Sequence, residues 1–142
     1  MPIKYTAHNE GQLFHAIVSG TVTDKELLDY EKFFVTDDRI SPGADVVFEI
    51  KPDSISKITK NGVLKAIEQR VGLPIKARLS HCAIVTQHKN RHIWKTAQLY
   101  KKENEKKFPG VVIVIFCDLN VAKKWLNIKI ELMNNQTKGL LA

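Results

Sequence analysis

The sequence has few of the features that mark secreted, membrane-spanning or disulfide-rich proteins. Its 142 residues include only two cysteines, and its longest apolar run, residues 111–117, is far shorter than the roughly 20 residues that a membrane-spanning helix needs. Residues 1–5 lack the basic segment and apolar run of a secretory signal. We therefore expect a cytoplasmic protein in which Cys82 and Cys117, both in apolar strand-like segments, are reduced core thiols. A disulfide between them is the alternative, because the sequence does not say whether their strands are adjacent.

The sequence also lacks the short motifs that identify common catalytic and nucleotide-binding sites. No G-x-G-x-x-G follows a strand, and the patterns G-x-x-x-x-G-K-[ST], G-x-S-x-G and H-E-x-x-H are absent. His88 and His92 have the spacing of two metal ligands on one helix, but the two basic residues between them disfavour a cation. Among the predicted strand-end loops, carboxylates occur only at Asp53 and Asp118. We therefore expect no enzymatic activity, no cofactor and no metal site.

The composition predicts one globular domain with an uneven charge distribution. Apolar residues make up 44% and charged residues 26% of the chain, values typical of globular proteins. We expect a single domain over residues 1–134 and a polar C-terminal tail over residues 135–142. Residues 1–50 hold four Lys or Arg against nine Asp or Glu, whereas residues 51–107 hold fourteen against four. The basic middle segment either meets an anionic partner or simply solvates a helix face.

Hydrophobic periodicity predicts five strands that alternate with helices. Strands are predicted at residues 4–8, 13–18, 44–50, 80–86 and 111–116. Helices are predicted after Thr23, from about Val63, from about Asn90, and after Asp118 or Asn120. Thr23 and Glu26 have the spacing of a capping box. The expected core stripes of the four helices are Leu27, Tyr30 and Phe34; Leu64, Ile67 and Val71; Ile93, Trp94, Ala97 and Tyr100; and Val121, Trp125, Ile128 and Leu132.

This order of elements predicts an α/β fold. The tight turn at residues 9–11 makes the first two strands antiparallel. Each later strand follows a helix, which requires right-handed crossovers and a parallel sheet. We therefore expect one mostly parallel five-stranded sheet, with the first strand antiparallel and about four helices.

In such a sheet, ligands and partners meet the loops that follow the carboxyl ends of the parallel strands. Those loops are predicted at residues 19–21, 51–54, 86–88 and 117–118. Asp53 and Ser54 are the first candidates for a contact or modification site, and Thr86 and His88 are the next. Ser54 or Asp53 could instead cap the helix that follows.

Three segments resemble a known family. Ser19-Gly20-Thr21-Val22-Thr23-Asp24-Lys25-Glu26 enters the first helix after an early strand, and Cys82-Ala83-Ile84-Val85-Thr86 is followed by Trp94. Phe108-Pro109 precedes the last strand, and Ala122-Lys123-Lys124-Trp125-Leu126 follows it. In order and spacing these segments resemble the STAS domain of bacterial anti-sigma-factor antagonists, and more closely the SpoIIAA-like family. The resemblance covers about residues 4–127.

The resemblance implies a cytoplasmic bacterial protein with no cofactor and no established catalysis. The family fold has also been likened to CRAL-TRIO lipid carriers, which implies a hydrophobic ligand or a protein partner. In true antagonists a partner kinase phosphorylates a serine in a D-S-[ST]-G loop after the third strand, which adds charge at a helix N-terminus. Asp53-Ser54-Ile55-Ser56 occupies the corresponding place, but Lys51-Pro52 precedes it and no glycine follows the serine.

Together these observations predict a non-enzymatic, STAS-like regulatory or protein-binding module. One alternative is a carrier of a small hydrophobic or lipid-like ligand, suggested by the family likeness and the aromatic residues. Another is an electrostatic binder of an anionic membrane or nucleic acid, suggested by the basic middle segment, although a nucleic acid is the less expected partner. The sequence predicts no transmembrane segment and leaves the oligomeric state open.

Overall fold

A computed structural model of the chain places five strands in one sheet, in the order β1-β2-β4-β6-β7. It describes residues 2–41, 43–71, 81–86 and 90–127. The strands are β1 (Ile3–His8), β2 (Leu13–Val18), β4 (Asp45–Ile50), β6 (His81–Val85) and β7 (Val112–Phe116). β1 runs antiparallel to β2, and the other neighbours are parallel. The predicted α/β fold class and strand directions are therefore confirmed.

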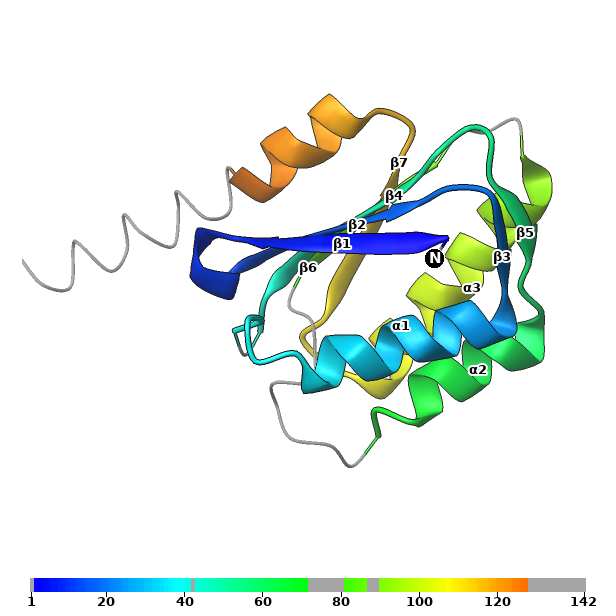
Figure 1. Cartoon of the computed structure of the whole chain (residues 1–142), viewed down its shortest axis with the longest axis horizontal. Coiled ribbons are helices and arrows are strands. Elements are labelled where there is room, and N and C mark those ends of the chain that lie inside the picture. The colour runs from blue at the N-terminus through cyan, green and yellow to red at the C-terminus, as the bar shows by residue number, and fades with distance from the viewer. Residues whose placement is uncertain (1, 42, 72–80, 87–89, 128–142) are drawn as a thin grey trace, which may run out of the picture.

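The helices lie on both faces of this sheet but not in equal numbers. α1 (Asp24–Thr36), α2 (Lys60–Glu68) and α3 (Arg91–Lys107) cover one face. A last helix, over residues 119–127, covers the opposite face (Figure 1). No helix in the described part of the chain is both long and apolar enough to cross a membrane.

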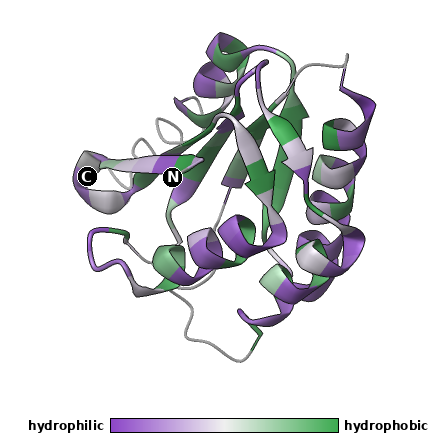
Figure 2. Ribbon diagram, turned by 45° about the vertical axis from the view of Figure 1, so that its right-hand side comes forward, coloured by the Kyte–Doolittle hydropathy of each residue, from purple (hydrophilic) through white to green (hydrophobic). Residues whose placement is uncertain are grey.

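The alternation of side chains along the strands builds two apolar layers. Val46 of β4 belongs to the large core under α1, α2 and α3, whereas its neighbour Val47 packs with Ala122 and Leu126 of the last helix. Successive strand residues point to opposite faces of a sheet, so Val46 and Val47 contribute to different layers. Figure 2 shows the strands as the hydrophobic centre of the molecule, with hydrophilic residues along the outer sides of the helices.

A second, two-stranded sheet was not predicted. β3 (Thr21–Thr23) pairs in parallel with β5 (Ile55–Lys57), and each strand leads into a helix. Because the two strands lie side by side, the first residues of α1 and α2 also lie side by side (Figure 1). Asp24 at the start of α1 accepts hydrogen bonds from the Thr59 amide, at 2.7 Å, and from the Thr59 hydroxyl, at 2.6 Å.

Several local predictions about the first and third helices are confirmed. Glu26 accepts a hydrogen bond from the Thr23 amide at 2.9 Å, as expected for a capping box. Leu27, Tyr30 and Phe34 are buried. Asn90 is the N-cap of α3, where its side chain accepts the Ile93 amide at 3.1 Å.

The second helix differs from its prediction in start, cap and buried face. It begins at Lys60 and includes Gly62, and its N-cap is Thr59, whose hydroxyl accepts the Gly62 amide at 3.1 Å. Asp53 and Ser54 therefore do not cap it. Val63, Ala66 and Ile67 form its buried face, whereas Val71 lies beyond the helix and is 54% exposed.

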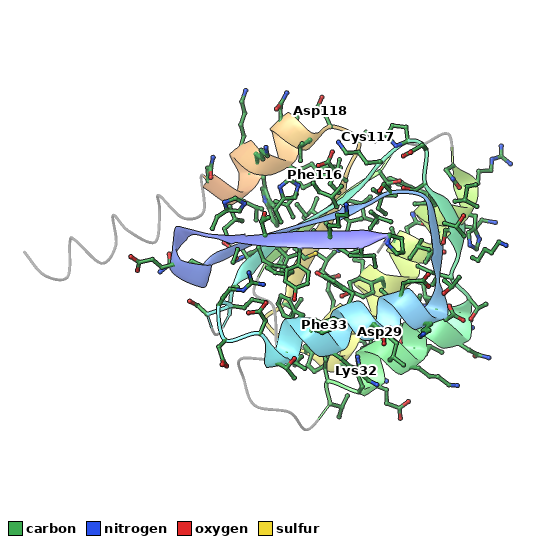
Figure 3. The ribbon with its side chains drawn as sticks, viewed as in Figure 1. Asp29, Lys32, Phe33, Phe116, Cys117 and Asp118 are labelled. Atoms are coloured by element: carbon green, nitrogen blue, oxygen red, sulfur yellow. The ribbon has the colours of Figure 1, made fainter. Side chains whose placement is uncertain are left out.

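The predicted burial of Cys117 and part of the last core stripe are wrong. Cys82 is buried, but Cys117 follows the end of β7 and is exposed (Figure 3). Both thiols are free. Val121 is 53% exposed, and Ala122 and Leu126 are the buried residues of the last helix. The predictions for Gly72, Ile128, Leu132 and the tail at residues 135–142 lie outside the described residues.

Candidate ligand-binding site

An apolar cavity of about 60 Å³ lies between the main sheet and the three helices that cover it. Side chains from the sheet and from every one of these helices line it, among them Val18, Val46, Ile84, Leu27, Val63 and Ala97. Most of these side chains belong to the large core. The cavity is thus a gap in the packing of that core at the place where three helices meet one sheet.

A buried polar network forms part of the cavity wall. The Tyr100 hydroxyl donates to Glu31 Oε1 at 2.6 Å, and Arg70 Nε lies 3.3 Å from Glu31 Oε2. Arg70 also donates to the Asn104 side-chain oxygen. Burial, and then the neighbouring Glu31 carboxylate, raise the pKa of Tyr100 well above its usual range. The network thus pairs its own charges inside the protein, which leaves the surrounding wall apolar.

Cys82 also lines the cavity, but its environment opposes nucleophilic chemistry. Burial raises the pKa of this thiol to about 12, and the Glu31 carboxylate adds to the effect. A thiol is reactive as the thiolate, so Cys82 stays protonated at neutral pH. Among the described residues, no group of three or more His, Cys, Asp or Glu side chains is arranged to hold a metal ion.

An open groove of about 460 Å³ lies directly beside the cavity. Ser56, Ile58, Val63 and Thr96 line both spaces, so they form the boundary between groove and cavity. The outer part of the groove is polar and basic, and it is lined by Lys57, Thr59, Lys60, His92 and Lys95.

The local structure explains why these side chains meet. β5 carries Ser56 and Lys57, the first turn of α2 carries Lys60, and the first turns of α3 carry His92 and Lys95. β5 follows the carboxyl end of β4, and α3 follows the carboxyl end of β6. The groove therefore lies at the strand-end rim of the sheet, where open α/β folds bind ligands.

Of the predicted site residues that the structure describes, Ser54 lines the cavity, whereas Asp53 and Thr86 line neither the cavity nor the groove. Asp53 is exposed in the loop after β4. Ser54 is 4% exposed, and its hydroxyl donates to the Val18 carbonyl at 2.9 Å. Thr86 is 2% exposed, and its amide donates to the Phe116 carbonyl at 2.8 Å. His88 lies outside the described residues.

The residues that line the groove were missed by the sequence analysis. Their signal in the sequence is the excess of basic residues over positions 51–107, which predicts either an anionic partner or a solvated helix face and selects no particular residue. Lys57 and Lys60 are three positions apart, but Lys95 lies 35 positions further along the chain, and the three residues belong to different elements. Only the tertiary fold brings them to one groove.

The opposite face of the sheet carries two histidine–carboxylate pairs. His15 Nε2 lies 3.1 Å from Glu49 Oε1, and His81 Nδ1 lies 3.1 Å from Asp45 Oδ1. Lys51 Nζ also lies 3.1 Å from Glu49 Oε2. Burial alone would raise the pKa of Glu49, but its hydrogen bonds to Lys51 and His15 outweigh that effect and lower the pKa. These pairs are separated from the groove by the sheet.

A solved structure has a similar fold. It is an uncharacterized protein of the DUF3478 family with a SpoIIAA-like fold, from Shewanella loihica PV-4. The similarity has a TM-score of 0.52 and 13% sequence identity, and covers 87% of this chain and 91% of that chain. No family model matches the sequence, and no curated protein matches it. At this identity the similarity shows the fold alone, so the chain has the SpoIIAA-like fold that its sequence predicted.

Proposed function

We propose that this protein is a non-enzymatic binding module that holds a small, partly apolar ligand in the groove and the cavity behind it. The observation that carries this proposal is that the groove and the cavity lie side by side and share the lining residues Ser56, Ile58, Val63 and Thr96. Ligand sites are commonly concave, mostly apolar and supplied with a few polar groups. The groove and cavity together have this character.

The chemistry of the cavity wall supports binding rather than catalysis. Its titratable groups include Glu31, Tyr100 and Cys82. Glu31 and Tyr100 bond to each other, and the Cys82 thiol is protonated because burial raises its pKa. None of these three groups has the environment of an activated nucleophile or a general base near neutral pH.

The volumes limit the kind of ligand. The cavity, at about 60 Å³, is well below the roughly 300 Å³ at which small-molecule pockets begin. A ligand therefore places only a short apolar end in the cavity, and the larger groove holds the rest. A single chain of methylene groups suits this shape better than a fused ring system.

A neutral probe tests the proposal without involving charge. In a titration of the ¹⁵N-labelled protein with 1-octanol, we expect saturable amide shifts around Ile58, Val63 and Thr96. Ile58 is half-buried where the groove meets the cavity, so Ile58→Trp should block the entrance and abolish these shifts. Ile55 is 57% exposed on β5, three residues before Ile58, and lines neither space, so Ile55→Trp is the matched control.

The proposal fails if 1-octanol causes no saturable shifts, or if the shifts lie on another part of the molecule. It also fails if both tryptophan variants bind as the unmodified protein does. A folded spectrum of each variant must accompany the comparison, because a tryptophan at a half-buried position can disturb packing.

A protein partner at the same rim is the second candidate function, and it would make the chain a regulatory module. Asp53 is exposed in the loop after β4, where a partner can reach its carboxylate. Ser54 would become accessible to a kinase only if its hydrogen bond to Val18 opened. Alanine substitution of Asp53 should weaken capture of such a partner from the native host. Unchanged capture would count against this role.

A further inference from the structure

We infer that the groove selects a ligand with an anionic head group, so that the ligand is a small acidic amphiphile such as a medium-chain carboxylate or alkyl phosphate. This inference rests on the proposed binding function and specifies its ligand. Three lysines, Lys57, Lys60 and Lys95, line the outer groove, and His92 lies with them. Among the described residues, no acidic side chain lines the groove.

The charges of these three lysines are not taken up by ion pairs within the described part of the chain. No ion pair found within residues 2–41, 43–71, 81–86 and 90–127 involves Lys57, Lys60 or Lys95. All three side chains are exposed. The positive potential of the groove is therefore available to an anion from outside.

The acidic group at the start of α1 lies next to the groove but does not line it. Both oxygens of the Asp24 carboxylate accept hydrogen bonds from Thr59, one from its amide and one from its hydroxyl. The carboxylate thus helps to hold the starts of α1 and α2 together. Since it does not line the groove, it leaves the three lysines facing solvent.

The apolar part of the ligand has a defined direction. Ile58, Val63 and Leu99 line the groove beside the lysines, and Ile58 and Val63 continue into the cavity. A head group held at the lysines therefore sends its chain inward along these side chains. Charge at the outer end and apolar surface at the inner end match an amphiphile with one acidic end.

The test compares one neutral and two anionic probes of equal chain length: 1-octanol, octanoate and octyl phosphate. Calorimetric or amide-shift titrations at low salt give the affinity of each probe for the unmodified protein. The site variant is Lys57→Gln with Lys60→Gln and Lys95→Gln. The control variant is Lys65→Gln with Lys102→Gln and Lys106→Gln, which removes the same charge from exposed lysines of α2 and α3 outside the groove.

We expect at least one anion to bind the unmodified protein about tenfold more tightly than 1-octanol, since several exposed charge pairs each contribute modestly. The site variant should lose this preference while it still binds 1-octanol, and the control variant should keep it. The preference for an anion over 1-octanol should decrease as the salt concentration rises. The two anions show whether a carboxylate or a phosphate is the better head group.

Three results would overturn the inference. Equal binding of 1-octanol and both anions would refute the anionic head group and leave the proposed binding function standing. An equal loss of preference in the site and control variants would assign the effect to overall charge. If none of the three probes binds saturably, the proposed function itself fails together with the inference.

Discussion

Arg70 and Glu31 form a buried ion pair, in which Arg70 Nε lies 3.3 Å from Glu31 Oε2 and each side chain is 1% exposed. Glu31 belongs to α1, whereas Arg70 lies just after α2. Arg70 also bonds to Asn104 of α3, and its guanidinium lies 5.2 Å from the centre of the Phe108 ring. The pair therefore joins the three helices that cover the cavity.

Removing only the cation should destabilise the protein strongly. In Arg70→Met the Glu31 carboxylate stays buried without its partner, and the expected loss of unfolding free energy is about 3–5 kcal/mol. The double variant Glu31→Leu with Arg70→Met should recover much of this loss, because it buries no unpaired charge. Urea unfolding measures both values. A double variant as unstable as the single one would mean that the charge pair is not the source of the loss.

Gly62 and Asp24 make a second coupled pair, at the starts of α2 and α1. Replacing glycine by alanine inside a helix usually stabilises it by about 1 kcal/mol. Here the added Cβ would overlap the Asp24 carboxylate, which is bonded to Thr59. We therefore expect Gly62→Ala to lower the unfolding free energy. In an Asp24→Ala background the same substitution should become neutral or stabilising, and a double-mutant cycle measures the coupling. If Gly62→Ala changed the unfolding free energy equally in both backgrounds, the two residues would not be coupled.

The main sheet was predictable because each strand carries its own local signal. The run at residues 13–18 was predicted as a strand, and β2 has these bounds. Residues 9–11 signalled a turn, and β1 and β2 are antiparallel across it. Periodicity and turn residues act over a few positions, so they are readable from the sequence alone.

The small sheet and the second helix depend on longer-range contacts. β3 and β5 have three residues each, too few for a readable alternation, and they pair across 34 positions in register (Thr21 with Ile55). That pairing places Asp24 beside Thr59, which starts α2 at Lys60. The predicted start near Val63 gave too much weight to the helix-breaking tendency of Gly62 and missed its buried contact.

The groove could not be predicted, whereas its location at the strand-end rim could. The rule that ligands meet the carboxyl ends of parallel strands indicated the edge of the sheet at which the groove lies. It could not select Lys57, Lys60 and Lys95 among the many basic residues, because their convergence depends on the unpredicted β5 and on the packing of α2 against α3.

The two cysteines should differ sharply in reactivity. Cys117 is exposed between Phe116 and Asp118 at the end of β7 (Figure 3), whereas Cys82 is buried and its pKa is raised to about 12. The thiolate is the nucleophile that attacks thiol reagents. At pH 8 the native protein should therefore react with Ellman's reagent at one thiol, and the unfolded protein in urea at two. The variant Cys117→Ser should show no rapid reaction. Rapid labelling of both thiols in the native protein would mean that the core around Cys82 opens readily.

The ion pair between Asp37 and Arg39 should determine part of the loss of folding stability at low pH. Arg39 donates to Asp37 Oδ1 at 3.0 Å and to Oδ2 at 2.6 Å, and Tyr5 donates to Oδ2 at 3.1 Å. The Arg39 guanidinium holds the pKa of the Asp37 carboxyl well below its usual range, against the opposing effect of burial. A carboxyl whose pKa is lower in the folded state stabilises the fold above its unfolded pKa, which is about 3.9. This contribution is lost progressively as the pH falls below that value.

In Arg39→Met the pKa of Asp37 should rise toward its usual range, so this group should no longer add to the loss of stability in acid. Urea midpoints measured from pH 6 to pH 2 should therefore fall less steeply in the variant than in the unmodified protein. The variant should be the less stable of the two at pH 6, because it lacks the ion pair at the C-terminal end of α1, where a carboxylate is otherwise unfavourable. The two curves should converge at low pH.

Lys32→Met, which removes an exposed charge from α1, is the control. Parallel curves for Arg39→Met and the unmodified protein would show that Asp37 does not set the slope.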